Sequence, residues 1–177
     1  MIWNSKNEWK GTSVALPIGP TTKYIDIINW DGGCQFILSE DKKLLKIENQ
    51  KEINDIVDLE GIIKDIPTSM AAFDQYISIG WFGGFVYTFH ISNPEDLYQQ
   101  PLPPYLGLGA SEEAEIKEFP DTIILKMDKQ RLVGVYSDRT MVIFGRELEM
   151  ETKIEHIVQN HAKAIHSIQM LPNESSK

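Results

Sequence analysis

Short apolar segments separated by polar turns dominate the first part of the chain. Thr22–Trp30, Cys34–Ser39 and Leu44–Glu48 are such segments, and the first is rich in β-branched and aromatic residues, which favour strands. Asp31–Gly33 separates the first two, and Glu40–Lys43 separates the second from the third. Tight polar turns between short strands predict an antiparallel meander.

Two longer segments have a helical spacing of apolar residues. In Gln50–Ile66 these residues lie mostly three or four apart, and Pro67 follows. In Glu147–Ile168 the steps are four, three, four and three, and Pro172 lies just beyond the segment. An apolar residue at every third or fourth position forms one face of a helix. The sequence therefore predicts a mid-chain helix and a C-terminal amphipathic helix.

The segments between these two predicted helices have the composition of strands and loops. Tyr76–Ile91 is strongly apolar and aromatic, with Gly80, Gly83 and Gly84 inside it, and predicts a buried strand with a glycine bend. Asp121–Met127 and Arg131–Tyr136 flank a short polar stretch and predict a β-hairpin. The proline-rich segment Ser92–Lys117 is expected to be the longest loop.

Together these elements predict an α+β fold. Its antiparallel β-sheets, a meander plus a hairpin, would be accompanied by the mid-chain helix and the C-terminal amphipathic helix. A chain of 177 residues fits one domain. We expect a single α+β domain over residues 1–172, followed by a polar C-terminal tail over residues 173–177.

Composition and charge narrow the possible partners and location. The formal net charge is −9, which repels phosphate backbones and anionic lipid surfaces. Cys34 is the only cysteine, so an intramolecular disulfide is impossible and a reducing compartment is expected. The sequence has neither a signal-peptide pattern at its start nor an apolar run long enough to cross a membrane. We therefore expect a cytoplasmic protein that binds neither nucleic acid nor membranes.

The candidate catalytic and metal-binding residues do not form a recognisable set. His156, His161 and His166 are five residues apart, which on a helix of roughly 100° per residue turns each one by about 140° from the last. They cannot converge on one metal. Gly83 and Gly84 are followed by a strand pattern and lack the lysine of a phosphate-binding loop, so they are interpreted as structural glycines. We expect no catalytic residues and no metal site in this chain.

Three blocks of sequence, in order, resemble one enzyme family. Lys23–Asp31 resembles an early strand of aminodeoxychorismate synthase component I and of the related anthranilate synthase component I. Phe82–Tyr87 is similar to that family's segment of a phenylalanine, two glycines and a strand. Phe119–Leu125 with Asp128 resembles its Tyr-Asp-Thr hairpin. A predicted helix separates the first two blocks and a proline-rich loop the last two, as in the family. The match covers the family's N-terminal region, roughly residues 20 to 170.

The resemblance implies a non-catalytic N-terminal subunit or domain of a chorismate-aminating synthase. In that family the chorismate-binding residues and the Mg²⁺-binding glutamates lie in a C-terminal half, so Mg²⁺ is expected there and no cofactor in this chain. The implied partners are that catalytic half and a glutamine amidotransferase. Thr22, Lys23 and Tyr24 occupy the place of the family's Ser-Arg-aromatic triplet beside an effector pocket. The family's Leu-Leu-Asp/Glu-Ser effector element has no counterpart around residues 13–17.

Composition also supports a hypothesis of a different class. A small, strongly acidic chain could be a free-standing protein-binding module, of the inhibitor or immunity type, that blocks a basic partner. This hypothesis expects a charged rim around a few aromatic anchors, whereas the synthase hypothesis expects a large apolar face, with Trp81 and Phe82 as candidates. Both hypotheses predict a protein partner.

Overall fold

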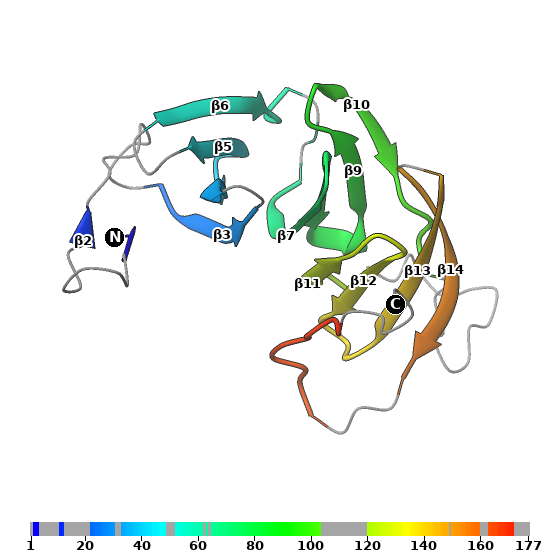
Figure 1. Cartoon of the computed structure of the whole chain (residues 1–177). Coiled ribbons are helices and arrows are strands. Elements are labelled where there is room, and N and C mark those ends of the chain that lie inside the picture. Colours follow the sequence, from blue (N-terminus) through cyan, green and yellow to red (C-terminus); the bar gives the residue numbers. More distant parts are fainter. Residues whose placement is uncertain are drawn as a thin grey trace. The chain divides into compact units, whose positions relative to one another are not determined.

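The chain forms two compact units, Met1–Lys64 and Asp65–Lys177, and each is described by itself (Figure 1). The computed structural model describes residues 2–3, 11–12, 22–30, 33–48, 52–61, 63, 65–103, 120–148, 150–159 and 163–171. The single domain expected over residues 1–172 stays a prediction, because compactness alone does not show how many parts of a chain fold independently.

The first unit is built on one four-stranded antiparallel sheet with strands in chain order. Its strands are β3 (Tyr24–Asn29), β4 (Gln35–Ser39), β5 (Lys43–Glu48) and β6 (Glu52–Asp58). Ile37, Leu45 and Ile47 form a buried cluster on β4 and β5. The three strands expected from the sequence coincide with β3, β4 and β5. Two short strands, β1 (Ile2–Trp3) and β2 (Gly11–Thr12), pair with each other.

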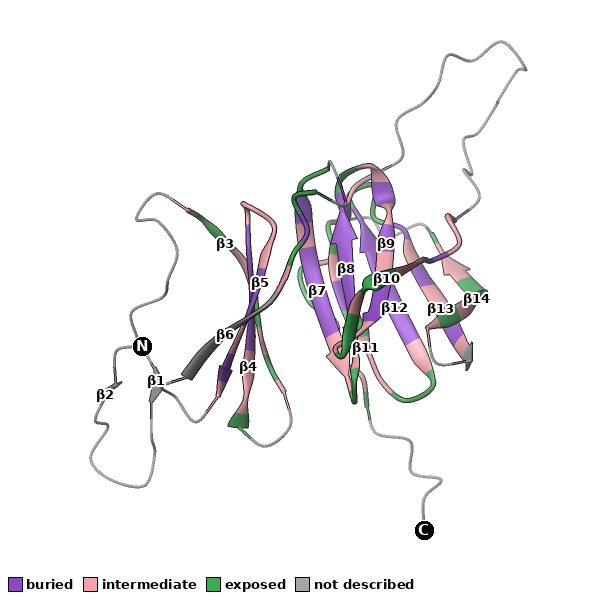
Figure 2. Ribbon diagram, turned by 90° about the horizontal axis from the view of Figure 1, so that it is seen from above, coloured by how far each residue is buried: buried purple, intermediate pink, exposed green. Residues whose placement is uncertain are grey.

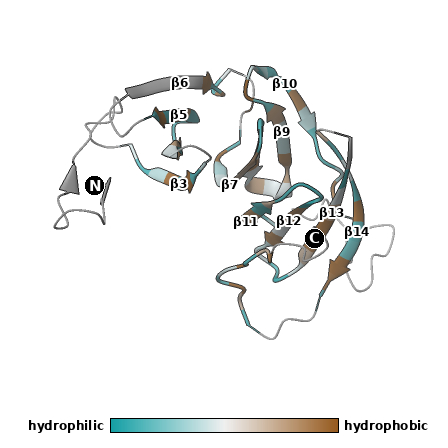
Figure 3. Ribbon diagram, viewed as in Figure 1, coloured by the Kyte–Doolittle hydropathy of each residue, from teal (hydrophilic) through white to brown (hydrophobic). Residues whose placement is uncertain are grey.

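The second unit contains two further four-stranded antiparallel sheets, each again in chain order. One consists of β7 (Pro67–Phe73), β8 (Tyr76–Trp81), β9 (Val86–His90) and β10 (Asn93–Gln99). The other consists of β11 (Thr122–Met127), β12 (Arg131–Tyr136), β13 (Met141–Leu148) and β14 (Glu151–Val158). Strand β14, which is the outer strand of its sheet, carries both hydrophobic and hydrophilic residues (Figure 3).

The two sheets of the second unit share one core. Strand β11 packs against β7 and β8, and buried residues run along β7, β8, β9 and β12 (Figure 2). The core combines Ala71 and Val86 of one sheet with Leu125, Val142 and Phe144 of the other. The first strands of the two sheets therefore lie side by side.

Gly80 allows this close approach of β11. A Cβ atom at Gly80 would lie 2.7 Å from Ser69 Oγ and 2.7 Å from Thr122 Cγ2, closer than side-chain atoms pack. Ser69 belongs to β7 and Thr122 to β11, so the space above Gly80 is filled by residues from both sheets. A larger residue at position 80 would push the two first strands apart.

The predicted α+β class is wrong, because no helix of seven or more residues occurs in the part of the chain that the structure describes. The predicted mid-chain helix, Gln50–Ile66, is replaced over Glu52–Asp58 by strand β6. A register shift between the pairs Leu44–Val57 and Leu45–Asp55 leaves Ile56 as an extra residue in β6. Such a bulge interrupts the alternation of a strand, so an apolar spacing of three does not require a helix.

The predicted C-terminal helix, Glu147–Ile168, is also absent, because the chain forms the end of β13 and then β14 there. Phe144 pairs with Ile154, and Val142 pairs with Ile157. Only one residue separates Val142 from Phe144 but two separate Ile154 from Ile157, so β14 is bulged. Both isoleucines pack against the shared core. The bulge thus brings residues three apart to the same face, which imitates the periodicity of a helix. Residues 163–171 have no regular structure.

The apolar segment Tyr76–Ile91 forms two strands where one bent strand was expected. Strands β8 and β9 pair antiparallel to each other; Gly83 and Gly84 lie in the turn that joins them, and Gly80 lies on β8. The expected long loop, Ser92–Lys117, begins with strand β10; Pro94 is tolerated there because β10 is an edge strand. Residues 104–117 of that loop lie outside the described residues. No described helix has both the length and the apolar character needed to cross a bilayer.

Candidate functional site

The turn between β8 and β9, which we call the Phe82 loop (Trp81–Phe85), presents an aromatic side chain to solvent. Trp81 is fully buried, and Phe82, the next residue, is 43% exposed. Trp81 N–H donates to Phe85 O at 2.9 Å and closes the loop. Gly83 and Gly84 have φ values of 73° and 79°, in the left-handed region that glycine adopts at little cost. The sequence WFGG thus anchors one aromatic ring and exposes the next.

Two contacts from outside the turn fix the Phe82 loop. Phe82 N–H donates to Ile66 O at 3.0 Å, in the segment that leads into β7. Gly83 N–H donates to Asp121 Oδ1 at 2.9 Å. Asp121 immediately precedes β11, so its carboxylate connects the loop of one sheet to the first strand of the other. A bond to a charged acceptor is stronger than a bond between neutral groups.

The turn between β12 and β13, which we call the Arg139 loop (Tyr136–Thr140), has the same closing bond. Tyr136 N–H donates to Thr140 O at 2.9 Å, and Tyr136, like Trp81, is buried. Arg139 has a φ of 74° at the position that Gly84 holds in the Phe82 loop. Ser137, which is exposed and polar, holds the position of Phe82.

Asp121 joins the two loops. Besides accepting from Gly83, it accepts Ser137 N–H at its backbone oxygen at 2.9 Å, and its own N–H donates to Ser137 Oγ at 3.0 Å. Within the Arg139 loop, Asp138 accepts from Thr140 N–H at 2.9 Å and from the Thr140 hydroxyl at 3.0 Å. The two loops and the start of β11 therefore form one hydrogen-bonded surface at one end of the second unit.

A buried polar network connects the two sheets elsewhere. Gln100, at the end of β10 and 2% exposed, donates from Nε2 to Thr88 Oγ1 at 2.8 Å and to Met150 O at 2.7 Å. Its Oε1 accepts from the Thr152 hydroxyl at 2.5 Å. Thr88 also shares a 2.7 Å hydrogen bond with Ser78. One amide thus satisfies partners on both sheets, which fixes how they pack.

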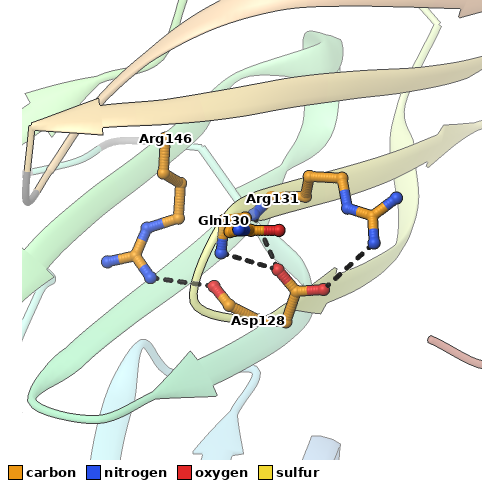
Figure 4. Close-up of polar contacts among 4 residues, drawn as sticks. All are labelled: Asp128, Gln130, Arg131 and Arg146. Atoms are coloured by element: carbon orange, nitrogen blue, oxygen red, sulfur yellow. Dashed lines mark hydrogen bonds and ion pairs between the residues drawn. The ribbon is translucent and has the colours of Figure 1, made fainter. Parts of the chain in front are cut away.

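A charged cluster lies at the β11–β12 turn (Figure 4). Asp128 Oδ1 accepts the backbone N–H groups of Gln130 and Arg131 at 2.8 and 2.7 Å, and its Oδ2 lies 3.7 Å from Arg131 Nη2. Arg146 Nη1 donates to Asp128 O at 2.9 Å. The Arg146 guanidinium also lies over the Phe73 and Tyr76 rings of the other sheet, at 5.8 and 5.2 Å.

The contacts of Arg146 are structural. Burial lowers the pKa of the Arg146 guanidinium, and nearby Tyr76, Asp128 and Asp74 oppose that shift. Arginine stays charged in spite of such shifts, because its ordinary pKa is above 12. The cluster therefore holds a cation between two sheets by stacking and hydrogen bonding.

No protein-family model matches this chain, and no curated protein is similar to it in sequence. Function has to be argued from the surface itself.

The residues that the family resemblance suggested for effector binding lie in the first unit. Lys23 Nζ is 3.6 Å from Glu40 Oε2, and both side chains are largely exposed. Tyr24, the first residue of β3, is 43% exposed. Lys23 O accepts Glu40 N–H at 2.8 Å. Thr22, Lys23 and Tyr24 are thus surface residues beside the β4–β5 turn, and their effector role stays a prediction.

The histidines have different positions from those expected on one helix. His156 lies on β14, His166 lies in the irregular segment 163–171, and His161 lies outside the described residues. His90 Nδ1 shares a 2.7 Å hydrogen bond with Ser92. No group of three or more metal-ligating side chains occurs among the residues that the structure describes.

Of the two aromatic residues named from the sequence as candidates for an apolar face, Trp81 is fully buried and Phe82 is exposed. The turn that separates them was not predicted, because the glycines were expected to bend a single strand. The exposure of Phe82 depends on Ile66 and Asp121, which are distant in sequence. The available signal for the turn was the pair Gly83–Gly84, because two adjacent glycines are typical of a turn.

Proposed function

We propose that this chain is a protein-binding module made of repeated four-stranded sheets, with blades like those of a β-propeller. The observation that carries the proposal is that three successive segments form the same four-stranded antiparallel meander. The first strands begin at Tyr24, Pro67 and Thr122 and are thus 43 and 55 residues apart. Propeller repeats have roughly 40 to 50 residues and four strands per blade.

The packing within the second unit supports this architecture. Neighbouring propeller blades place their first strands around a common centre, and β11 lies beside β7 and β8. The step from architecture to protein binding is an analogy, since one fold serves many functions. It gains support from the second unit, where exposed Ile66, Phe82 and Ile123 accompany acidic residues.

Charge and location complete the proposal. The net charge of −9 favours encounter with a basic protein partner. The single cysteine, Cys34, is a free thiol, which fits the reducing cytoplasm. The module thus corresponds to the acidic protein-binding hypothesis, with the partner held by an apolar centre and drawn in by charge.

Affinity capture tests protein binding. The full chain is immobilised, native cell extract is passed over it at low and high salt, and retained proteins are quantified by mass spectrometry. We expect a basic protein to be retained in near-stoichiometric amount, and less of it in high salt. An unrelated acidic protein of similar size is the control. Equal retention by the control and by the chain would contradict the proposal.

The order of the three sequence blocks favours a second candidate function, the non-catalytic half of a chorismate-aminating synthase. The blocks Lys23–Asp31 and Phe82–Tyr87 include β3 and the Phe82 loop, and Phe119–Leu125 includes the start of β11. The helix expected between the first two blocks does not support this candidate, because strand β6 occupies Glu52–Asp58. The catalytic half would supply the Mg²⁺ site and chorismate binding, and a glutamine amidotransferase would supply ammonia.

Reconstitution separates the two candidates. The chain is mixed with a catalytic half of the family, and ammonia-dependent loss of chorismate is measured with and without it. The synthase candidate expects a rate increase on addition of the chain. An unchanged rate would eliminate that candidate and leave the protein-binding module unaffected.

A further inference from the structure

Three exposed apolar residues lie on the Phe82 loop or on the two segments that are hydrogen-bonded to it. Ile66 is 42% exposed, Phe82 is 43% exposed and Ile123 is 39% exposed. Phe82 is bonded through its backbone to Ile66, and Gly83 is bonded to Asp121, two residues before Ile123. We call these three residues, together with Asp65, Asp121 and Asp138, the Phe82 surface. All six belong to the second unit.

The loop geometry does not require an aromatic residue at position 82. The Arg139 loop has the same closing hydrogen bond and carries the exposed, polar Ser137 at the corresponding position. A serine therefore fits this type of turn. Ile66 and Ile123 extend the exposed apolar surface beyond this one residue, and a group of exposed apolar residues rimmed by polar ones is typical of an interaction surface.

The backbone under Phe82 is held in place before any partner arrives. Three hydrogen bonds hold residues 81 to 83, and the buried Trp81 ring anchors the loop from below. A preorganised anchor loses little conformational entropy on binding. This arrangement favours a short, specific contact made by one ring.

The charges around the apolar centre are mostly negative. Asp65 precedes Ile66, Asp121 supports the loop, and Asp138 follows Ser137; Arg139 is the basic residue of the two loops. The Asp65 charge is also felt at β9, where burial and then Asp65 raise the pKa of the Tyr87 hydroxyl. Charge complementarity therefore selects a cationic partner.

We propose that the Phe82 surface binds a segment of a partner protein in which an aromatic or aliphatic residue stands next to lysine or arginine. The apolar residue packs on Phe82, Ile66 and Ile123, and the basic side chain faces the aspartates. This inference rests on the proposed protein-binding function and names the site and the chemistry of the partner.

A random-peptide phage library panned on the full chain tests the proposal. Selected sequences are expected to combine an apolar residue with a neighbouring lysine or arginine. A fluorescein-labelled synthetic copy is then titrated with the chain by anisotropy. Phe82→Ser, which copies Ser137, should weaken binding by about tenfold or more, as the loss of an aromatic anchor does. Its thermal unfolding should match the wild type.

Two further variants control the experiment. Ile27→Ser removes a 56% exposed residue of the first unit and should leave peptide affinity unchanged. Asp65→Asn combined with Asp138→Asn should slow association several-fold at low salt and little at high salt.

The possible failures are distinguishable. Selected peptides without basic residues, or peptides that bind Phe82→Ser as well as wild type, would overturn the Phe82 surface and leave protein binding intact. If no peptide is selected, the protein retained from cell extract is tested against Phe82→Ser, and undiminished retention overturns the surface. If the extract also yields no partner, the proposed function fails too.

Discussion

The Phe82 loop and the Arg139 loop are both tight turns closed by one backbone hydrogen bond, but different residues stabilise them. Each follows the second strand of a four-stranded sheet, and each is closed by a hydrogen bond from a buried aromatic residue, Trp81 or Tyr136. The Arg139 loop is stabilised from within by Asp138, in addition to the two hydrogen bonds between Ser137 and Asp121. The Phe82 loop uses glycines, which bring no side-chain bonds, and depends on Asp121 from outside.

This difference between the two loops indicates which of their side chains stabilise the turn and which are available to bind a partner. A turn stabilised by its own polar side chains has those positions occupied by structural roles. A glycine turn held from outside leaves one position without a role in the turn, and Phe82 occupies it. The comparison therefore indicates that sequence variation in this type of turn serves the surface more than the fold.

The aromatic anchors are expected to be equivalent and to produce the largest effects. Trp81→Ala and Tyr136→Ala should each lower the free energy of unfolding by about 3 to 5 kcal/mol, because each leaves a large cavity in the core. Phe82→Ala, at an exposed neighbour, should change it by less than about 0.5 kcal/mol. Ser137→Ala should lower it by about 0.5 to 1.5 kcal/mol, because it removes the acceptor of the Asp121 N–H. Urea denaturation measures all four. A loss below about 1 kcal/mol for either anchor would contradict the equivalence.

Removal of the Asp121 carboxylate should affect both stability and the Phe82 loop, whereas removal of the Asp138 carboxylate should affect the Arg139 loop alone. Asp121→Ala should cost about 1.5 to 3 kcal/mol, since it removes a charged acceptor from the part-buried Gly83 N–H. Asp138→Ala, in an exposed turn, should cost about 1 kcal/mol. Amide hydrogen exchange of Gly83 should accelerate only in Asp121→Ala.

Asp121→Asn is the matched control, because its side-chain oxygen can still accept from Gly83. It should protect the Gly83 amide nearly as well as wild type. Equal acceleration of Gly83 exchange in Asp138→Ala would show that the Phe82 loop does not depend on Asp121 alone.

The sequence predicted the strands whose signals are local. Strands β3, β4 and β5 and the β11–β12 hairpin follow from short apolar runs with polar turns between them. The two predicted helices were wrong because extra residues in β6 and β14 gave apolar spacings of three. A bulge is defined by the partner strand, which the sequence of one segment does not contain.

The repeat and the turn that exposes Phe82 were missed for related reasons. The corresponding turns share a closing hydrogen bond and a left-handed residue, Gly84 or Arg139. Gly83 is left-handed as well and Asp138 is not, so the two turns share little sequence and only part of their geometry. The unequal spacing of the sheets also hides the period. The exposure of Phe82 depends on contacts with Ile66 and Asp121, which only the fold brings together.

Substitution of the left-handed residues should affect the free energy of unfolding differently in the two loops. Gly83→Ala and Gly84→Ala should each cost about 1 to 2 kcal/mol, because a Cβ atom strains a positive φ; at Gly83 it would also lie 3.3 Å from the Phe85 ring. Arg139→Gly should change stability by less than about 0.5 kcal/mol, since relief of strain is offset by greater freedom of the unfolded chain. Thermal and urea unfolding of the three variants check this. A cost for Arg139→Gly as large as for the glycine variants would contradict it.

The smallest difference concerns alkaline pH, because only one of the two anchors can titrate. Burial, reinforced by the Asp138 charge, raises the pKa of the Tyr136 hydroxyl above its ordinary value of 10.0. Below about pH 10 both folded and unfolded chains keep this proton. Above it the unfolded chain loses the proton first, so stability falls by up to about 1.4 kcal/mol per pH unit.

Tyr136→Phe should lack this part of the decline in stability, whereas the stability of Trp81→Phe should decline in parallel with that of the wild type. Urea denaturation between neutral and alkaline pH measures the slopes, and an unchanged slope in Tyr136→Phe would show that Tyr136 is not the titrating anchor.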